Sequence, residues 1–323
     1  MLLIRFSSIG DIVLTSPVAR CLKTQIGAEV HFLCKISFRT LLEANPYIDK
    51  IYSIKKDVKE VTAALKAEQY DVVIDLHKNI RSLQVRRALG VKSYAFDKIN
   101  LAKWLMVNFK VNRLPDKHIV DRYLKTVEAL GVKNDGQGLD YFIPPNQAID
   151  LTALAKQFHF GESLQQYTVF AVGAAHATKR LPQEKIIAIC KSIKSPILLI
   201  GGPQEKTVGE QIVAAAGPHV INTCGQMSLH QSASIIQQSS EVISHDTGMM
   251  HIAAAFRKKI ISIWGNTIPE FGMYPYYPSG MNLNRSIEVK GLSCRPCSKI
   301  GFEQCPKGHF RCMREISSDF LNG

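Results

Sequence analysis

A polar segment in the second half of the chain, residues 244–251 (SHDTGMMH), combines side chains that could hold an anionic, hydroxyl-bearing ligand. It follows a β-branched apolar pair and precedes the small-residue helical pattern of residues 252–256, so it predicts a strand, a tight turn and a helix start. The first N–H groups of a helix lack partners and carry partial positive charge, which suits phosphate. Asp246 and His251 would add hydrogen bonds to ligand hydroxyls. An N-cap role for Asp246, with Thr247 starting the helix, explains the segment alone equally well.

Residues 7–11 (SSIGD) form a second candidate, directly after the first apolar run. They contain one glycine, so the G-x-G-x-x-G fingerprint of dinucleotide-binding proteins is missing, and no G-x-x-x-x-G-K-[ST] P-loop occurs in the sequence. Asp11 lies where the loop enters a helical pattern. There it could take a proton from a substrate or cap the helix, and the residues alone leave both roles open.

Two further loops, residues 173–182 (GAAHATKRLP) and 201–205 (GGPQE), also follow apolar runs. Lys179 is a point charge able to neutralise a diphosphate, whereas Arg180 could bind it bidentately. The two glycines of the second loop would let a ligand approach the backbone. A solvated basic pair and an ordinary turn are the alternative interpretations of these loops.

The elements that must position these loops alternate between strand and helix. In the first half we predict strands at residues 2–6, 29–34, 51–54, 71–76 and 91–96, and helices at residues 12–25, 58–68 and 119–130. In the second half we predict strands at residues 167–172, 197–200, 220–222, 241–244 and 260–264, and helices at residues 183–192, 208–216, 230–239 and 249–256. The alternation predicts an α/β protein with two doubly wound parallel sheets. Two prolines at 144–145 interrupt it, so we expect domains at residues 1–150 and 151–323, with a ligand cleft at the carboxyl ends of their strands.

Composition narrows the class of partner. The chain has 323 residues, of which 46% are apolar, enough to form two cores. Its 40 Lys and Arg against 27 Asp and Glu give a net charge of +13, which favours nucleic acid, phosphorylated small molecules or an anionic membrane surface. No apolar run reaches membrane-spanning length and the N-terminal run is too short for a signal peptide, so we expect a cytoplasmic protein. Phe and Tyr are not interleaved with the basic residues, which argues against nucleic-acid binding.

Together the loops resemble glycosyltransferase family 9, the bacterial heptosyltransferases of lipopolysaccharide assembly. The matching motifs occur in the family's order: S-S-x-G-D at residues 7–11, K-R-x-P at 179–182, G-G-P at 201–203, G-x-M-S-L at 225–229 and D-T-G-x-x-H at 246–251. The resemblance covers nearly the whole chain. It implies the GT-B architecture, in which two Rossmann-like domains face each other across a cleft. The acceptor would bind the N-terminal domain and a nucleotide-sugar donor the C-terminal domain.

The same resemblance implies roles for single residues. Asp11 would be the general base that takes the proton from the acceptor hydroxyl, and Lys179 would stabilise the leaving nucleoside diphosphate. The implied donor contacts are Thr178, Glu205 on the ribose, Met227 beside the base, Asp246 on sugar hydroxyls, the amides of Thr247 and Gly248 on the diphosphate, and His251 nearby.

These roles fit the chemistry of glycosyl transfer. Displacing a diphosphate from an anomeric carbon develops negative charge on the leaving group, which Lys179 and a helix N-terminus could stabilise without a metal. A base on the opposite face of the sugar implies inversion, and no D-x-D pair for a divalent ion is present. The prediction is an inverting, metal-independent transfer of heptose from ADP-heptose to a lipopolysaccharide inner-core acceptor, with no cofactor. A GT-B transferase with another nucleotide sugar, or a basic nucleic-acid-binding protein, is the alternative.

For the acceptor side we expect contacts from Ser8, Lys78 and Arg81. An inner-core acceptor would carry carboxylates and phosphates, which suits basic side chains, although a solvated helix start explains each residue equally well. Such an acceptor also implies peripheral contact with the inner face of the cytoplasmic membrane.

Four cysteines near the C-terminus, Cys294, Cys297, Cys305 and Cys312, have a spacing that could form a tetrahedral structural zinc site. The second half of this set lacks the second C-x-x-C pair of a zinc ribbon. Free thiols or disulfides are therefore the alternatives.

Overall fold

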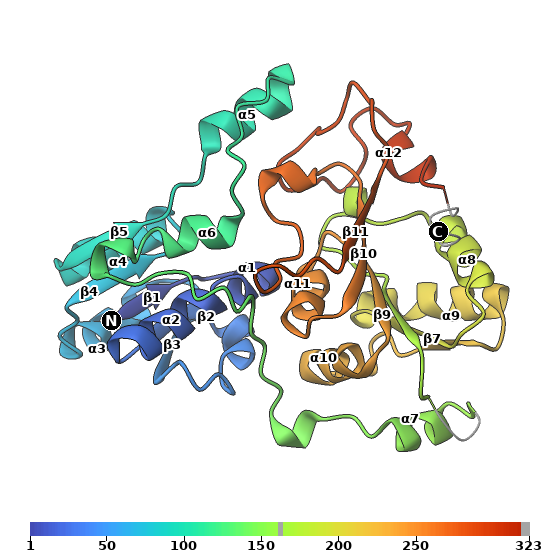
Figure 1. The fold of residues 1–323 in the computed structure, drawn as a ribbon, viewed down its shortest axis with the longest axis horizontal. Coiled ribbons are helices and arrows are strands. Elements are labelled where there is room, and N and C mark those ends of the chain that lie inside the picture. Colours follow the sequence, from blue (N-terminus) through green and yellow to red (C-terminus); the bar gives the residue numbers. More distant parts are fainter. Residues whose placement is uncertain (161–163, 318–323) are drawn as a thin grey trace. The chain divides into compact units, whose positions relative to one another are not determined.

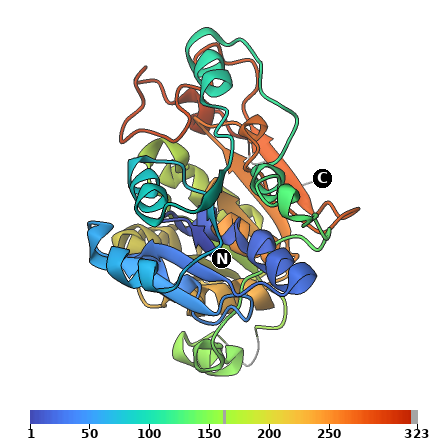
Figure 2. The same cartoon turned by 90° about the vertical axis from the view of Figure 1, so that its left-hand side faces the viewer.

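The computed structural model describes residues 1–160 and 164–317, which form two α/β units (Figures 1 and 2). Unit 1 holds residues 1–99, 117–142 and 276–280; unit 2 holds residues 100–116, 143–275 and the described part of 281–323. This division differs from a single boundary at residue 150. Residues 100–116 join unit 2, where the Lys110 Nζ donates to the Pro296 carbonyl oxygen at 2.7 Å. Residues 276–280 join unit 1, where the Tyr276 hydroxyl donates to Asp121 Oδ1 at 2.8 Å.

Unit 1 contains a five-stranded parallel sheet with the order β3-β2-β1-β4-β5. Its strands are β1 (Leu2–Ile4), β2 (His31–Lys35), β3 (Lys50–Ile54), β4 (Val72–Asp75) and β5 (Lys92–Ala95). Its helices are α1 (Ile9–Val13), α2 (Ser16–Ile26), α3 (Lys59–Ala67), α4 (Ile80–Leu89) and α6 (Ile119–Leu124). The single helix predicted at residues 12–25 is divided into α1 and α2. Pro17 falls in the first turn of α2, where a residue without an N–H favours a new helix start.

Unit 2 contains a six-stranded parallel sheet with the order β11-β10-β9-β6-β7-β8. Its strands are β6 (Thr168–Ala171), β7 (Ile197–Ile200), β8 (Val220–Asn222), β9 (Glu241–His245), β10 (Lys259–Trp264) and β11 (Asn284–Glu288). Its helices are α5 (Asn100–Phe109), α7 (Leu151–Gln157), α8 (Gln183–Ser192), α9 (Lys206–Ala216), α10 (Leu229–Gln238), α11 (Gly248–Ala255) and α12 (Arg311–Arg314). Figure 1 shows α8 and α9 together on one face of this sheet and α10 and α11 on the other. The doubly wound prediction is therefore confirmed for both units, while β11, α4, α5, α7 and α12 lie outside the predicted ranges.

Each sheet has one point at which the order of its strands reverses. In unit 1 the chain runs from β1 outward to β3 and returns to β4, so β1 and β4 flank this switch point. In unit 2 it runs from β6 outward to β8 and returns to β9, so β6 and β9 flank it. Helices diverge to opposite faces at such a point and leave an opening at the carboxyl ends of the two strands, where ligands bind in open α/β sheets.

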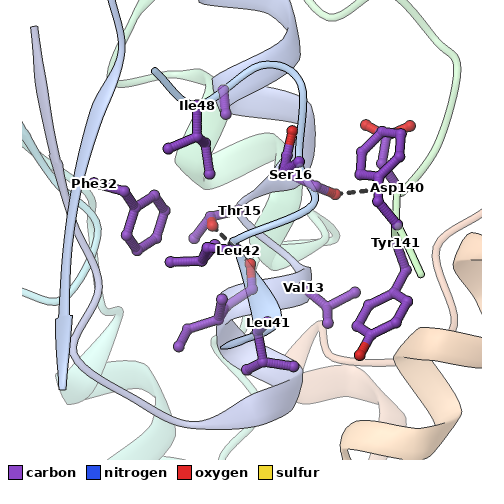
Figure 3. Close-up of a pocket in the computed structure, with 13 residues that line it drawn as sticks. Val13, Thr15, Ser16, Phe32, Leu41, Leu42, Ile48, Asp140 and Tyr141 are labelled. Carbon is purple, nitrogen blue, oxygen red and sulfur yellow. Dashed lines mark hydrogen bonds between the residues drawn. The ribbon is translucent and has the colours of Figure 1, made fainter. Parts of the chain in front are cut away.

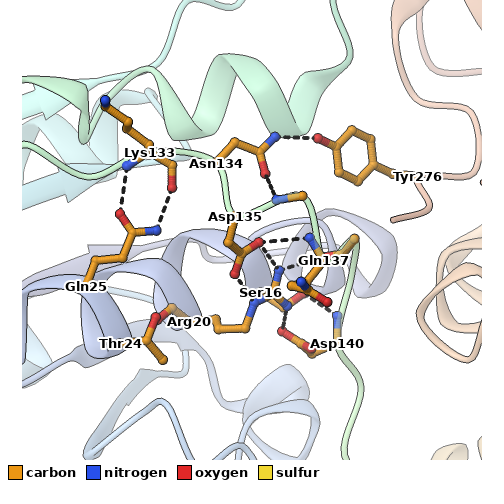
Figure 4. A network of polar contacts seen from close by, with 12 residues as sticks. Ser16, Arg20, Thr24, Gln25, Lys133, Asn134, Asp135, Gln137, Asp140 and Tyr276 are labelled. Carbon is orange, nitrogen blue, oxygen red and sulfur yellow. Dashed lines mark hydrogen bonds and ion pairs between the residues drawn. The ribbon is translucent and has the colours of Figure 1, made fainter. Parts of the chain in front are cut away.

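A charged network fastens α2 to the segment that follows α6 in unit 1 (Figure 4). Arg20 is almost fully buried, and its guanidinium pairs with Asp135 at 2.7 Å and with Asp140, and donates to the Gly138 carbonyl at 2.8 Å. Beside it, Gln25 and Lys133 exchange hydrogen bonds in both directions. These contacts join residues more than 100 positions apart in the sequence.

We expect Arg20→Leu to lower the free energy of unfolding by about 3 kcal/mol, because it leaves two largely buried carboxylates without their cation. Arg39→Leu is the matched control, since Arg39 pairs with Glu43 at the surface and should contribute less than about 1 kcal/mol. Urea unfolding followed by circular dichroism measures both. Equal losses in the two variants would contradict the importance of the buried network.

The cavity shown in Figure 3 lies in unit 1 beneath α1 and α2 and is lined largely by apolar side chains such as Phe32, Leu42 and Ile48. Its volume is about 10 Å³, roughly the least that a single water requires. It is a packing defect of the core and has no room for a substrate.

Candidate functional site

Lys179 and Asp246 meet at the switch point of unit 2. Lys179 lies in the loop after β6 and Asp246 directly follows β9, the neighbouring strand. The Lys179 Nζ lies 2.6 Å from Asp246 Oδ2 and 3.3 Å from the Asp246 carbonyl oxygen, with both side chains largely buried. The other carboxylate oxygen, Oδ1, has no hydrogen bond to any residue in the described part of the chain. It is therefore available to a ligand.

Two residues outside the sequence predictions hold this pair in place. Thr267, in the loop after β10, donates its hydroxyl to Asp246 Oδ2 at 2.8 Å. His245, the last residue of β9, accepts the backbone N–H of Leu181 at its Nε2 at 3.0 Å, which ties the Lys179 loop to that strand. Burial lowers the pKa of His245 to about 4, so the ring is neutral at neutral pH and can accept this bond. Their positions at carboxyl ends of adjacent strands were the signal that could have identified them.

The N-terminus of α11 opens directly after Asp246. Thr247 is the N-cap residue and Gly248 the first helical residue, so Asp246 is not the cap, and the expected cap role for it is wrong. The Asp246 carboxylate instead bonds to Lys179 and Thr267. The first amides of the helix remain available for anions. His251 lies one turn further along α11 and is buried.

The loops after β7 and β8 lie against each other. Glu205 Oε2 accepts the Gly202 N–H at 2.9 Å, and its Oε1 lies 3.7 Å from an Arg180 guanidinium nitrogen. The Gly225 N–H donates to the Gly201 carbonyl at 3.0 Å. A Cβ at Gly201 would lie 2.9 Å from Glu205 Cβ, so this glycine is needed for Glu205 to fit rather than only for ligand approach. Met227 follows in the second loop and is half-buried.

Thr178 has a structural role that the sequence does not indicate. Its side chain is 2% exposed, its hydroxyl donates to the Phe302 carbonyl at 3.1 Å, and it accepts the Phe302 N–H at 2.8 Å. These bonds attach the Lys179 loop to the cysteine-bearing segment. They occupy the hydroxyl, and the expected donor contact of Thr178 stays a prediction.

Asp11 lies at the switch point of unit 1, in the first turn of α1. Its Oδ1 is 2.6 Å from the Arg5 guanidinium, and its Oδ2 accepts the Ser8 N–H at 3.1 Å and the Ser8 hydroxyl at 2.9 Å. Ser8 is the N-cap residue and Asp11 is the third helical residue, whose carboxylate accepts the Ser8 N–H, so Asp11 takes part in a capping box without being the N-cap itself. Burial favours the protonated form, but Arg5 and the two Ser8 bonds outweigh it and lower the pKa of Asp11. The group is an ionised carboxylate at neutral pH.

Arg5 acts as a positioning residue for Asp11. It is buried and holds its guanidinium with bonds to the Ser7 carbonyl at 2.7 Å, the Leu76 carbonyl at 2.6 Å and the Tyr123 hydroxyl at 3.0 Å. A cation fixed by three further bonds cannot swing away, so the carboxylate beside it keeps one orientation.

Lys78 and Arg81 follow β4, on the other side of the same switch point, and both are exposed. Buried Asp75 at the end of β4 accepts the N–H groups of His77 and Lys78 at 3.0 Å and 2.6 Å, which shapes this turn. Burial and nearby Arg5 lower the pKa of His77 to about 3, so the ring is neutral at neutral pH. The expected acceptor residues are thus placed near β1 and β4, with Ser8 bonded to Asp11.

The zinc site expected from the four C-terminal cysteines stays a prediction. No three His, Cys, Asp or Glu side chains within residues 1–160 and 164–317 come together as a group that could hold a metal ion. Cys312 packs into the apolar core of unit 2, and Cys294 Sγ lies 3.8 Å from His309 Nε2. All four are free thiols. Burial and the three other thiols raise the pKa of Cys312, so its thiol is protonated at neutral pH.

Comparison with known proteins decides the family. The model of glycosyltransferase family 9 (heptosyltransferase) matches residues 58–301, well over half of the chain. The chain belongs to glycosyltransferase family 9. It is therefore a glycosyltransferase, as its motifs predicted.

Curated relatives of this glycosyltransferase match over most of their own length. Lipopolysaccharide heptosyltransferase 1 of Campylobacter coli is 26% identical over 320 residues, covering 89% of this chain and 88% of that protein. The protein of the same name from Escherichia coli (strain K12) is 26% identical over 294 residues, covering 83% and 88%.

Solved structures confirm the GT-B fold of this family 9 chain. The glycosyl transferase family 9 protein from Veillonella parvula DSM 2008 superposes with a TM-score of 0.75 at 21% identity, covering 99% of this chain and 94% of that one. E. coli heptosyltransferase WaaC with ADP gives a TM-score of 0.63 at 23% identity, covering 83% and 88%. No helix in the described part of the glycosyltransferase has the length and apolar character needed to cross a bilayer.

Proposed function

We propose that this glycosyltransferase transfers a heptose from ADP-heptose to an inner-core lipopolysaccharide acceptor, with inversion and without a metal ion. The observation that supports it most directly is the order of the candidate donor-binding residues along the carboxyl edge of the unit 2 sheet. Strands β9, β6, β7 and β8 are consecutive neighbours. Their loops carry Asp246, Lys179, Glu205 and Met227 in that order.

This order matches the order of parts in a nucleotide sugar. Asp246 would accept hydrogen bonds from sugar hydroxyls, Lys179 and the α11 amides would hold the diphosphate, Glu205 would accept from ribose hydroxyls, and Met227 would pack on the base. Strands lie about 4.8 Å apart, so the four loops extend over about 14 Å. A ligand with four successive parts can contact each loop in turn.

In the reaction, the Asp11 carboxylate takes the proton of the attacking acceptor hydroxyl, whose oxygen forms the new bond to the anomeric carbon. The bond from that carbon to the ADP oxygen breaks, and both electrons leave with the diphosphate. Lys179 and the helix N-terminus stabilise the negative charge that develops there. Attack from the face opposite the leaving group inverts the anomeric centre.

The proposal is tested by incubating the enzyme with candidate donors and a truncated lipopolysaccharide acceptor, followed by mass spectrometry of the product. Addition of one heptose from ADP-heptose supports it, and nuclear magnetic resonance of the new linkage gives its anomeric configuration. Transfer only from another nucleotide sugar would favour a different GT-B transferase. Thermal stabilisation by oligonucleotides alone would favour the nucleic-acid alternative.

Metal independence is tested by dialysis against EDTA. Full activity after dialysis supports it, and a loss of activity that added metal restores would contradict it.

The pH dependence of kcat/KM should depend on the ion pair between Arg5 and Asp11. The pKa of Asp11 lies below its ordinary value of 3.8, so the carboxylate is still ionised at pH 3.8. Any stability that the ionised carboxylate confers is lost only as the pH falls through the lowered pKa. Arg5→Met removes the cation and leaves burial, so the acid limb of kcat/KM should move up by about one unit or more. Arg5→Lys keeps a charge and should move it less. Profiles from about pH 3 to about pH 8 measure this, because the wild-type limb lies below pH 3.8; identical limbs in folded variants would rule out Asp11 as the titrating base.

A further inference from the structure

Helix α5 presents an apolar surface that nothing in unit 2 covers. No residue of α5 is buried, although seven of its ten residues are apolar (NLAKWLMVNF). Leu101 is 70% exposed, Trp104 52% and Phe109 60%, and the Trp104 and Phe109 rings meet edge to face at 5.2 Å. A helix this apolar is normally buried in a core, so its exposure in a described part of the chain requires an explanation.

The helix is oriented with its basic side chains toward unit 2. The Lys103 Nζ lies 5.6 Å from the centre of the Phe271 ring, and seven residues later the Lys110 Nζ donates to the Pro296 carbonyl at 2.7 Å. Leu101, two residues before Lys103, lies on the face of α5 opposite that lysine, and Trp104, three residues after Leu101, shares the face of Leu101. The usual arrangement, with apolar residues inward and charges outward, is reversed. Figures 1 and 2 both show α5 at the same end of unit 2 as α12.

The charge near the exposed face favours an anionic partner. Lys103 and Lys110 face unit 2, but exposed Arg113 lies beyond the helix end, and residues 100–113 contain no acidic residue, within a chain of net charge +13. Pairing with a second copy of this surface would bring like charges together, whereas an anionic lipid surface would attract them. Trp and Phe beside basic residues suit the headgroup level of a bilayer. A ten-residue helix is about 15 Å long, too short to span a hydrocarbon core of about 30 Å, so it would lie in the interface.

We propose that the exposed face of α5, made by Leu101, Trp104 and Phe109 with Arg113 beyond the helix end, docks the enzyme on an anionic phospholipid surface. The inference rests on the proposed function in one respect: a lipid-anchored acceptor is the reason for the enzyme to work at a membrane.

The test measures sedimentation of the full chain with phosphatidylglycerol–phosphatidylethanolamine vesicles, and with phosphatidylcholine vesicles for comparison. The double variant Leu101→Ser/Trp104→Ser should bind the anionic vesicles about tenfold or more weakly, because it removes two large apolar side chains from the interface. Ile80→Ser is the matched control, since Ile80 in α4 of unit 1 is 77% exposed and should leave binding unchanged. Equal vesicle binding by the wild type and the double variant would overturn the proposal.

Fluorescence supplies an independent readout. The chain has two tryptophans, and Trp264 is fully buried, so a blue shift on adding anionic vesicles must come from Trp104 and should vanish in Trp104→Phe. A wild-type spectrum that vesicles do not change would contradict insertion of α5.

Sedimentation velocity tests whether a second copy of the chain covers the exposed face of α5 instead. The proposal would be overturned if the wild type were a dimer, the double variant were a monomer, and both bound vesicles equally well.

Thermal stabilisation by ADP, measured on the same proteins, separates the two proposals. Retained stabilisation with lost vesicle binding supports the α5 surface. Absence of ADP stabilisation in the wild type would count against the donor site alone, because α5 contributes no residue to it.

Discussion

Asp11→Asn should lower kcat by about 10²–10⁴-fold, the usual contribution of a positioned general base. Asparagine keeps an oxygen that can accept from Arg5 but cannot take up a proton. Arg5 retains its bonds to Ser7, Leu76 and Tyr123, so the variant should fold. The affinity for ADP should not change, because Asp11 lies in unit 1 and the proposed nucleotide contacts lie in unit 2. Steady-state kinetics and ADP titration calorimetry measure both quantities.

Asp49→Asn is a closely matched control for this substitution. Asp49 also lies in unit 1, pairs with Lys23 at 2.6 Å and accepts a backbone N–H, that of Val30, at 2.8 Å. Lys23 and Val30 lower its pKa despite the opposing effect of burial, as Arg5 and Ser8 do for Asp11. It lies away from the carboxyl end of β1, so its replacement should leave kcat unchanged. If both variants lose activity equally, the effect of Asp11 is structural and the base must be another group.

Lys179→Met should lower kcat by about 10²–10³-fold, because it removes the cation proposed to stabilise the developing charge on the leaving diphosphate. It should also weaken ADP binding, unlike Asp11→Asn, since a diphosphate is present in both the bound and the transition states. Lys179→Arg retains the charge and should recover part of the loss. Lys185→Met is the control, because Lys185 lies on α8 in the same unit and its Nζ donates to the Ile316 carbonyl at 3.0 Å.

A complication arises from Asp246, which loses its ion-pair partner in Lys179→Met. The pair is largely buried, so this variant alone could reduce stability. Adding Asp246→Asn removes the unpaired charge and should recover the stability without recovering kcat. Recovery of kcat in the double variant would show that Lys179 acts only by neutralising Asp246.

The sequence predicted the two sheets and the loops at their carboxyl ends because parallel strands buried on both faces produce continuous apolar runs. It did not predict β11, whose NRSIE sequence is polar because it lies at the sheet edge. Nor did it predict α5, whose apolar residues are exposed and follow no single buried face. The split of the predicted helix at residues 12–25 depends on one proline in the first turn of α2.

Within the candidate site, strand adjacency explains the success with Lys179 and Asp246, since loops after neighbouring strands must lie close together. The contacts that could not be predicted from the sequence are those that depend on tertiary packing. Thr178 is bonded to Phe302, 124 residues away, and Cys312 packs into the apolar core of unit 2. Thr267 looks like an ordinary loop residue until the sheet order places it beside Asp246, and the bond from the Leu181 N–H to the His245 ring depends on tertiary packing in the same way.

Residues 276–280 pack in unit 1 although they follow most of unit 2 in the sequence, and this has a consequence for experiments on isolated units. Tyr276 bonds to Asp121 and Asn134, and a Cβ at Gly138 would lie 2.7 Å from the Pro278 nitrogen, so this short segment packs tightly against the end of unit 1. A fragment ending at residue 142 would lack these contacts and would carry α5 without the surface of unit 2 that it packs on. No single cut of the polypeptide releases either half intact, so the two halves are interdependent in folding even though each has its own sheet.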